Sequence, residues 1–189
     1  VEASRRAGEG LHLRHRIEHA QLLSPDDVPR LARLGIVASM QPLHATQDML
    51  LADALWGARC AGAYAWRSVL DSGAVLAFGS DAPVEDLSVI AGIHAAVTRR
   101  RPDGSPGPEG WIPGERLSAE EALRAYTVGA AYAGGEEAIK GSLSPGKLAD
   151  VAVLSRDLLA IPPDEILETE VVAPLLDGRF VYRQENALS

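Results

Sequence analysis

Hydrophobic and polar residues alternate over residues 11–19, with the period of two that is typical of a β-strand. Two almost wholly apolar runs, at residues 36–40 and 74–79, have the length and composition of strands buried on both faces. Segments whose apolar residues have helical spacing lie between and after these strands. This order of strands and helices predicts a parallel α/β sheet or barrel.

Capping residues mark where several helices begin and end. Ser24 can cap the first helix, Pro25 fits its first position, and Gly35 can end it. Ser118 and Glu121 match a capping box, which predicts the start of another helix. We expect helices at residues 24–35, 63–72, 88–100 and 118–133, and a loop rich in proline and glycine at residues 101–115.

The two ends of the chain differ from its middle. Residues 148–154 and 181–183 have the pattern of short strands, which predicts a small β module near the C-terminus. Residues 1–10 have the pattern of a helix tail followed by a glycine stop. A helix tail without a beginning predicts a fragment, a cleavage product or disorder upstream.

Composition narrows the classes of function. Hydrophobic residues make up 47% of the chain and charged residues 23%, the balance of an ordinary soluble globular protein. The net charge of −8 and the lack of a basic stripe predict no nucleic-acid partner. No membrane span, polybasic patch or signal peptide is expected. Cys60 is the only cysteine, which excludes an internal disulfide and agrees with a cytoplasmic location.

Two residues are candidates for metal chemistry. His19, in I-E-H-A-Q, and Asp81, in F-G-S-D-A-P, each follow a predicted strand, and catalytic groups of α/β barrels project from that end. Imidazole together with carboxylate suits a divalent metal such as zinc. A hydrogen-bonded core histidine and a turn-capping aspartate are the alternatives, and two ligands alone do not make a zinc site. His94, in the middle of a predicted helix, is expected to be a packing residue.

Five segments in order resemble the amidohydrolase superfamily, and most closely the branch called amidohydrolase family 3. They are R-H-R-I-E-H-A-Q, S-M-Q-P-L-H-A-T, A-F-G-S-D-A-P-V, L-R-A-Y-T-V-G-A-A-Y-A and K-G-S-L-S-P-G-K-L-A-D-V-A-V-L. The resemblance implies the C-terminal part of a (β/α)8 TIM barrel, with strands of a small β sandwich. Residues 1–139 would supply barrel strands six to eight with their helices, and residues 140–189 would belong to the sandwich.

The resemblance also implies roles for individual residues. His19 would be the metal-binding histidine after the sixth strand. Asp81 would be the aspartate after the eighth strand, which touches the metal and moves the proton of the attacking water. His44 follows the seventh-strand segment and could line the substrate pocket. The H-x-H motif and the fifth-strand histidine of the family are not in this chain, so its metal site is expected to be partial.

The sequence leaves two functional hypotheses. The first is a metal-dependent amidohydrolase, with zinc favoured, that hydrolyses C–N bonds other than peptide bonds in small amides or N-acyl compounds. Metal-activated water would attack, and Asp81 would carry its proton to the leaving nitrogen. The second is a non-catalytic piece or binding module that keeps the fold. Such a piece would form a homo-oligomer or associate with its missing N-terminal half, because an interrupted barrel leaves strand edges open.

Overall fold

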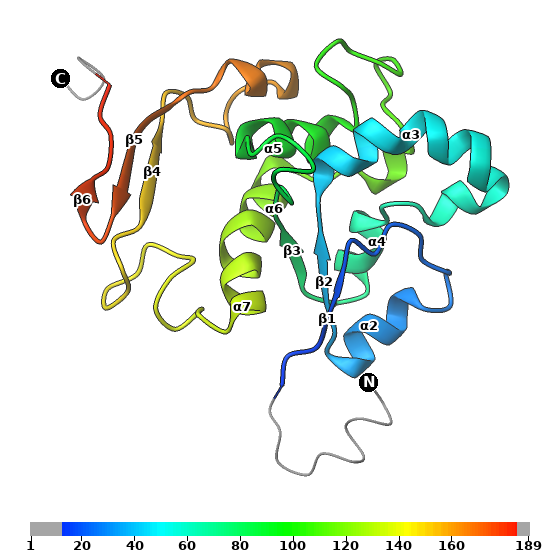
Figure 1. The fold of residues 1–189 in the computed structure, drawn as a ribbon, viewed down its shortest axis with the longest axis horizontal. Helices are drawn as coiled ribbons and strands as arrows, with labels where there is room; N and C mark the ends of the chain where they lie inside the picture. The colour runs from blue at the N-terminus through cyan, green and yellow to red at the C-terminus, as the bar shows by residue number, and fades with distance from the viewer. Residues whose placement is uncertain (1–12, 185–189) are drawn as a thin grey trace.

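The computed structural model describes residues 13–184 of the chain (Figure 1). The expected helix tail at residues 1–10 and the start of the strand expected at residues 11–19 lie outside this range. The described part contains two three-stranded sheets, one parallel and one antiparallel, with helices packed mainly around the parallel sheet. The mixed α/β class predicted from the sequence is therefore confirmed.

The parallel sheet is formed by strands in chain order. β1 (Arg16–Glu18) pairs with β2 (Val37–Met40), and β2 pairs with β3 (Leu76–Phe78). The two apolar runs predicted as strands thus form β2 and β3, although both strands are shorter than the runs. β3 is wholly buried and β2 nearly so, whereas every residue of β1 is exposed. The outer edge of β1 carries no partner strand within the described residues.

The first helix begins later than expected. α2 (Val28–Leu34) has Asp27 as its N-cap, so Ser24 and Pro25 lie in the turns before it. Pro29 replaces Pro25 in the first helical turn, where a missing N–H group costs no hydrogen bond. Gly35 ends the helix as predicted, with a left-handed φ of 57°.

Two helices after β3 begin with serine caps, of which the one at Ser118 was predicted. α5 (Val89–Thr98) starts at Ser88, whose side chain accepts a hydrogen bond from the backbone N–H of Ala91. The capping box of Ser118 precedes α6, and a π-helical turn joins α6 to α7. The three segments together cover most of the helix predicted at residues 118–133, with bounds α6 (Ala119–Arg124), η3 (Ala125–Gly129) and α7 (Ala130–Gly134).

The helix directly after β2 was not predicted. α3 (Pro42–Trp56) is the longest helix of the described chain and continues into the 3-10 helix η1 (Gly57–Gly62). Its buried residues lie mostly in its first half, whereas Leu50, Leu51 and Leu55 in the second half are exposed. The helix therefore lacks the continuous apolar stripe on which helix prediction depends.

The next helix is shorter than expected, and it contributes to an aromatic core. α4 (Trp66–Asp71) covers only the later part of the segment predicted as a helix over residues 63–72. Trp66 stacks edge-on against Phe78 of β3, which contacts Tyr126 of η3 in the same way. This aromatic series packs β3, which leads to Asp81, between two helical layers.

Arg99 is a fully buried charged residue at the end of α5. Its guanidinium donates to the carbonyl oxygens of Tyr64, at 2.9 Å, and of Trp111, and lies over the ring of Trp66. The backbone N–H of Trp111 donates in turn to the carbonyl of Arg99, at 2.9 Å. These bonds close the base of the predicted loop rich in proline and glycine, which contains only the short 3-10 helix η2 (Pro113–Glu115).

The second sheet is antiparallel and lies near the C-terminus. β4 (Val151–Leu154) falls inside the strand predicted at residues 148–154. It pairs with β5 (Val171–Leu176), and β5 pairs with β6 (Arg179–Phe180); the 3-10 helix η4 (Pro163–Glu168) lies between β4 and β5.

The prediction of a strand at residues 181–183 is wrong. The left-handed Asp177 and Gly178, with φ values of 50° and 73°, make a tight turn directly after β5. This turn sets the register so that Leu175 pairs with Phe180, and the regular strand ends there. The N–H groups of Val181 and Gln184 still donate to carbonyl groups of β5 beyond it. No helix of the described residues is long and apolar enough to cross a membrane.

Candidate metal centre

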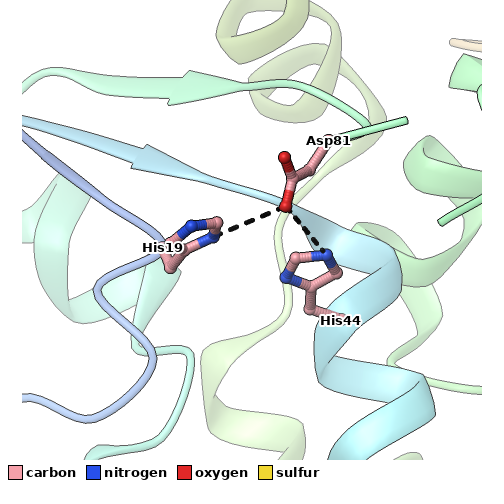
Figure 2. Close-up of side chains that lie close together, drawn as sticks. All are labelled: His19, His44 and Asp81. Carbon is pink, nitrogen blue, oxygen red and sulfur yellow. Dashed lines mark ion pairs between the residues drawn. The ribbon is translucent and has the colours of Figure 1, made fainter. Parts of the chain in front are cut away.

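Three candidate ligands meet at the carboxyl ends of the parallel strands (Figure 2). His19 directly follows β1, His44 lies in the first turn of α3 after β2, and Asp81 follows β3. Parallel strands end at the same edge of a sheet, so side chains at these positions are neighbours although they are far apart in sequence. The structure thus brings together all three residues that the sequence singled out.

The carboxylate of Asp81 lies between the two imidazoles. Its Oδ2 atom is 3.8 Å from Nε2 of His44 and 4.0 Å from Nδ1 of His19, and the three ligand atoms lie within 4.8 Å of one another. The two separations are too long for hydrogen bonds. Two bonds of about 2.1 Å from zinc to nitrogen or oxygen span at most about 4.2 Å. The 3.8 Å between His44 Nε2 and Asp81 Oδ2 lies within this span, so these two atoms have the spacing of ligands to one cation, with His19 beside them.

The polar environment of the two histidines differs. The side chain of His44 is only 8% exposed, and its Nε2 atom is buried with no hydrogen-bond partner among residues 13–184. His19 and Asp81 are partly open to solvent. A buried nitrogen without a partner is costly unless a ligand satisfies it, and a metal ion or a polar substrate group could do so at His44.

The backbone at the site is held in uncommon conformations. His19, Ala20 and Asp81 have φ values of 66°, 43° and 58°, in the left-handed region that residues other than glycine seldom adopt. Hydrogen bonds fix the first two: the N–H of His19 donates to Ser39 O at 2.7 Å, and the N–H of Ala20 donates to Glu18 O at 2.8 Å. Strain of this kind gathers at functional sites, where surrounding contacts maintain it.

Gln41 is a site residue that the sequence analysis did not single out. Its Oε1 atom lies 2.9 Å from Nδ1 of His19, and its side chain is buried at the start of α3. Because an amide oxygen can only accept, Nδ1 of His19 donates this hydrogen bond and Nε2 is the nitrogen left to bind a metal, which is the arrangement common for metal-binding histidines. Gln41 thereby fixes the direction of the ring. The available signal was its place in the quoted segment S-M-Q-P-L-H-A-T, three residues before His44.

His94 has a separate environment, on α5. It is almost fully buried, and burial followed by the nearby charge of Arg100 lowers its pKa to about 4. It is not among the described residues that could hold a metal ion. Its position inside a helix agrees with the expected packing role.

The fold and the site place this chain among α/β proteins whose candidate metal ligands cluster at the carboxyl ends of parallel strands. The chain belongs to the amidohydrolase family, whose family model matches residues 1–182. This match confirms the resemblance noted in the sequence.

Two characterised relatives are similar over much of the chain. The Arabidopsis thaliana protein LONG AFTER FAR-RED 3 is 44% identical over 174 residues, which cover 89% of this chain and 29% of the relative. The N-substituted formamide deformylase of Arthrobacter pascens is 35% identical over 121 residues, which cover 64% of this chain and 22% of the enzyme. The chain thus spans less than a third of the length of these relatives.

Solved structures of metal-dependent hydrolases have a similar fold. A hydrolase of this kind from Pyrococcus furiosus is 32% identical, with a TM-score of 0.67 over 84% of this chain and 31% of its own. One from Pyrococcus horikoshii is 28% identical, with a TM-score of 0.69 over 78% of this chain and 30% of its own. These relatives support a hydrolase role for the family to which the chain belongs.

Proposed function

We propose that this chain is the C-terminal part of a metal-dependent amidohydrolase, which hydrolyses C–N bonds other than peptide bonds in small amides or N-acyl compounds. The observation that carries the proposal is the meeting of His19, His44 and Asp81 at the carboxyl ends of three adjacent parallel strands. The formamide deformylase among the relatives, named for N-substituted formamides, supports the choice of substrate class.

The proposed place of the chain in the whole protein follows from its two sheets. β1, β2 and β3 would be strands six to eight of a (β/α)8 barrel, within residues 1–139. β4, β5 and β6 would be strands of the small β sandwich, within residues 140–189. The parallel order of the first sheet and the antiparallel order of the second support this division.

His19, His44 and Asp81 would hold the divalent metal, and zinc suits two nitrogen ligands and one oxygen ligand. The unpartnered Nε2 of His44 and the spacing around Asp81 Oδ2 support this fit. When bound, the metal supplies Lewis acidity that polarises a substrate carbonyl and makes water more acidic. His44 could instead contact the substrate, which is the role expected from the sequence.

Asp81 would move the proton. Its Oδ2 atom faces both imidazoles and its side chain is partly open to solvent, so water and substrate can reach it. The carboxylate would accept a proton at Oδ2 as water attacks the carbonyl, and would deliver it to the leaving nitrogen. Gln41 would keep the His19 ring turned toward this carboxylate.

A non-catalytic module that keeps the fold is the second candidate function. The exposure of all three residues of β1 favours it, because an open parallel strand can associate with another chain. Metal content distinguishes the two candidates.

The deciding experiment is elemental analysis of the 189-residue chain beside its His19→Ala and His15→Ala variants. We expect about one zinc per chain, lost from His19→Ala and kept in His15→Ala, because His15 is outside the ligand group. A wild-type chain without zinc would contradict the metal site.

In the longer protein, Asp81→Asn should lower kcat toward an N-substituted formamide by about 100-fold or more. Retained zinc with a raised KM in His44→Ala would assign His44 to the substrate.

A further inference from the structure

A second polar cluster is formed by side chains from segments that neighbour the candidate metal ligands in sequence. The hydroxyl of Tyr64 donates to Oδ2 of Asp48 at 2.6 Å. The side-chain amide of Gln21 donates to the same Oδ2 at 3.3 Å and to the Tyr64 hydroxyl at 3.1 Å. Each of the three side chains therefore contacts both of the others, and none of them is a candidate ligand in the proposed function.

The cluster joins the two chain segments that carry the histidines. Gln21 is two residues after His19, and Asp48 is one helical turn after His44 on α3. Tyr64 comes from a third segment, after η1, and its backbone N–H donates to the carbonyl of Gln21 at 2.9 Å. A shift of Gln21 relative to Asp48 would therefore change the spacing of the two imidazoles.

The segment after β1 needs such an anchor. His19 and Ala20 are both left-handed, and Tyr64 is as well, with a φ of 49°. Consecutive residues of this kind persist only where surrounding contacts determine the backbone. Gln21 is the next residue along the chain, and hydrogen bonds to Asp48 and Tyr64 hold its side chain in place.

The environment of Tyr64 suits a rigid anchor. The residue is 1% exposed, and its ring packs edge-on against Trp111. Burial, and next the hydrogen bond to Asp48, raise the pKa of the phenol above its ordinary value, so it stays a neutral donor. The ring packing means that removing only the hydroxyl should leave the core filled.

We propose that Gln21, Asp48 and Tyr64 form a positioning cluster that sets the spacing of His19 and His44 for the metal. The inference rests on the proposed function, because the spacing matters only if the two histidines act together. The three residues would not touch metal or substrate; they would act through the backbone of residues 19–21 and the first turns of α3.

The test is a titration of the 189-residue chain with Zn²⁺ by calorimetry and with Co²⁺ by absorption spectroscopy. The variants are Tyr64→Phe and Asp48→Leu, which removes the oxygen that accepts from both Gln21 and Tyr64. The matched control is Tyr126→Phe, which removes another buried phenolic hydroxyl, one that lies against Gly92 of α5. We expect both cluster variants to weaken Zn²⁺ affinity by about 10- to 100-fold and to change the Co²⁺ spectrum, as losses of outer partners do. The control should keep the wild-type affinity and spectrum.

Thermal unfolding of all variants separates positioning from folding. Wild-type affinity and spectrum in Tyr64→Phe or Asp48→Leu, whatever the change in melting temperature, would overturn this inference and leave the proposed function standing. If Tyr64→Phe does not fold, Asp48→Leu decides by the same readings, because it removes the acceptor and keeps much of the side-chain volume. A wild-type chain that binds neither metal would overturn the proposed metal site of this chain, and this inference with it.

Discussion

Gln41 contacts His19 through a single buried hydrogen bond, so its contribution can be isolated. Gln41→Leu keeps much of the side-chain volume and removes the acceptor at 2.9 Å from His19 Nδ1. No cap is lost, because the Gln41 side chain makes no capping hydrogen bond to α3. We expect Zn²⁺ affinity to fall by about 10-fold or more. Competition with a chelating dye measures this, and Gln47→Leu, at an exposed position of the same helix, should bind like the wild type.

The buried His94 should make the chain sensitive to acid. In the unfolded chain this histidine takes up a proton below about pH 6.5, whereas in the folded chain its pKa is about 4. The unfolded state therefore binds more protons between these values, and the free energy of unfolding should fall by up to about 3 kcal/mol as pH drops from 6.5 to 4. Urea unfolding at several pH values measures this loss. His94→Gln should flatten the dependence, and an equal slope in that variant would refute the assignment.

Arg99 places a guanidinium where a lysine cannot substitute for it. Each of its three guanidinium nitrogens donates to a different carbonyl group, those of Tyr64, Ala63 and Trp111. Burial lowers the pKa of Arg99 to about 10, so the side chain stays charged at neutral pH. One ammonium cannot reach all three acceptors. We expect Arg99→Lys to cost about 2–4 kcal/mol in the free energy of unfolding, and the exposed Arg30→Lys to cost almost nothing. Denaturant titration compares the two, and equal midpoints would contradict this account.

Among the elements, the helix pair around η3 depends on a close approach to the sheet. A Cβ atom on Gly129 would lie 2.1 Å from the carbonyl oxygen of Leu76 in β3. Gly129→Ala should therefore push η3 away from the strand that leads to Asp81 and destabilise the fold by about 1–3 kcal/mol. Gly114→Ala, where a Cβ meets open space, is the control and should be neutral or slightly stabilising. Thermal melts of the two variants test the difference.

Elements with strong local signals could be predicted from the sequence. β2 and β3 coincide with apolar runs, α5 falls inside the helix predicted at residues 88–100, and Ser118 caps α6 as its capping-box pattern indicates. α3 could not be found this way, because its first half is largely buried, with α5 packed against the helix, and its second half is largely exposed. The return strand β6 was misplaced because the turn at Asp177 and Gly178, and not side-chain alternation, determines its register.

The residues of the candidate site also differ in whether the sequence predicts them. His19, His44 and Asp81 each occur in a quoted family segment, and the structure brings them together. Gln41 and Gln21 also lie in quoted segments, but the sequence gives neither of them a role, and Asp48 and Tyr64 lie outside these segments. Their contacts join segments separated by 16 to 43 residues, and the distances depend on the tertiary packing of β1, α3 and η1.

For the whole molecule, the open edge of β1 and an apolar cavity of about 900 Å³ predict self-association. The cavity lies between α5, the π-turn η3 and the antiparallel sheet, and Ile93, Leu123 and Leu154 contribute to its wall. We propose that the isolated chain forms oligomers through these surfaces, or binds the rest of a longer protein. Light scattering of the wild-type chain should show species heavier than the 20.0 kDa monomer. The Ile17→Lys variant, which places a charge at an exposed position of β1, should form fewer of these species. A wild-type chain that stays monomeric at high concentration would refute self-association.

The closure between Arg99 and Trp111 has a consequence for protein engineering. Because backbone and side-chain hydrogen bonds join these two residues, the ends of the intervening loop stay together whatever its tip contains. The loop tip around Gly104 and Gly107 meets open space. A foreign peptide or fluorescent tag grafted there should cost little stability, since lengthening a closed loop adds only a slowly growing entropy term. The chain thus offers a place to attach a reporter outside the three chain segments that carry the residues proposed to hold the metal.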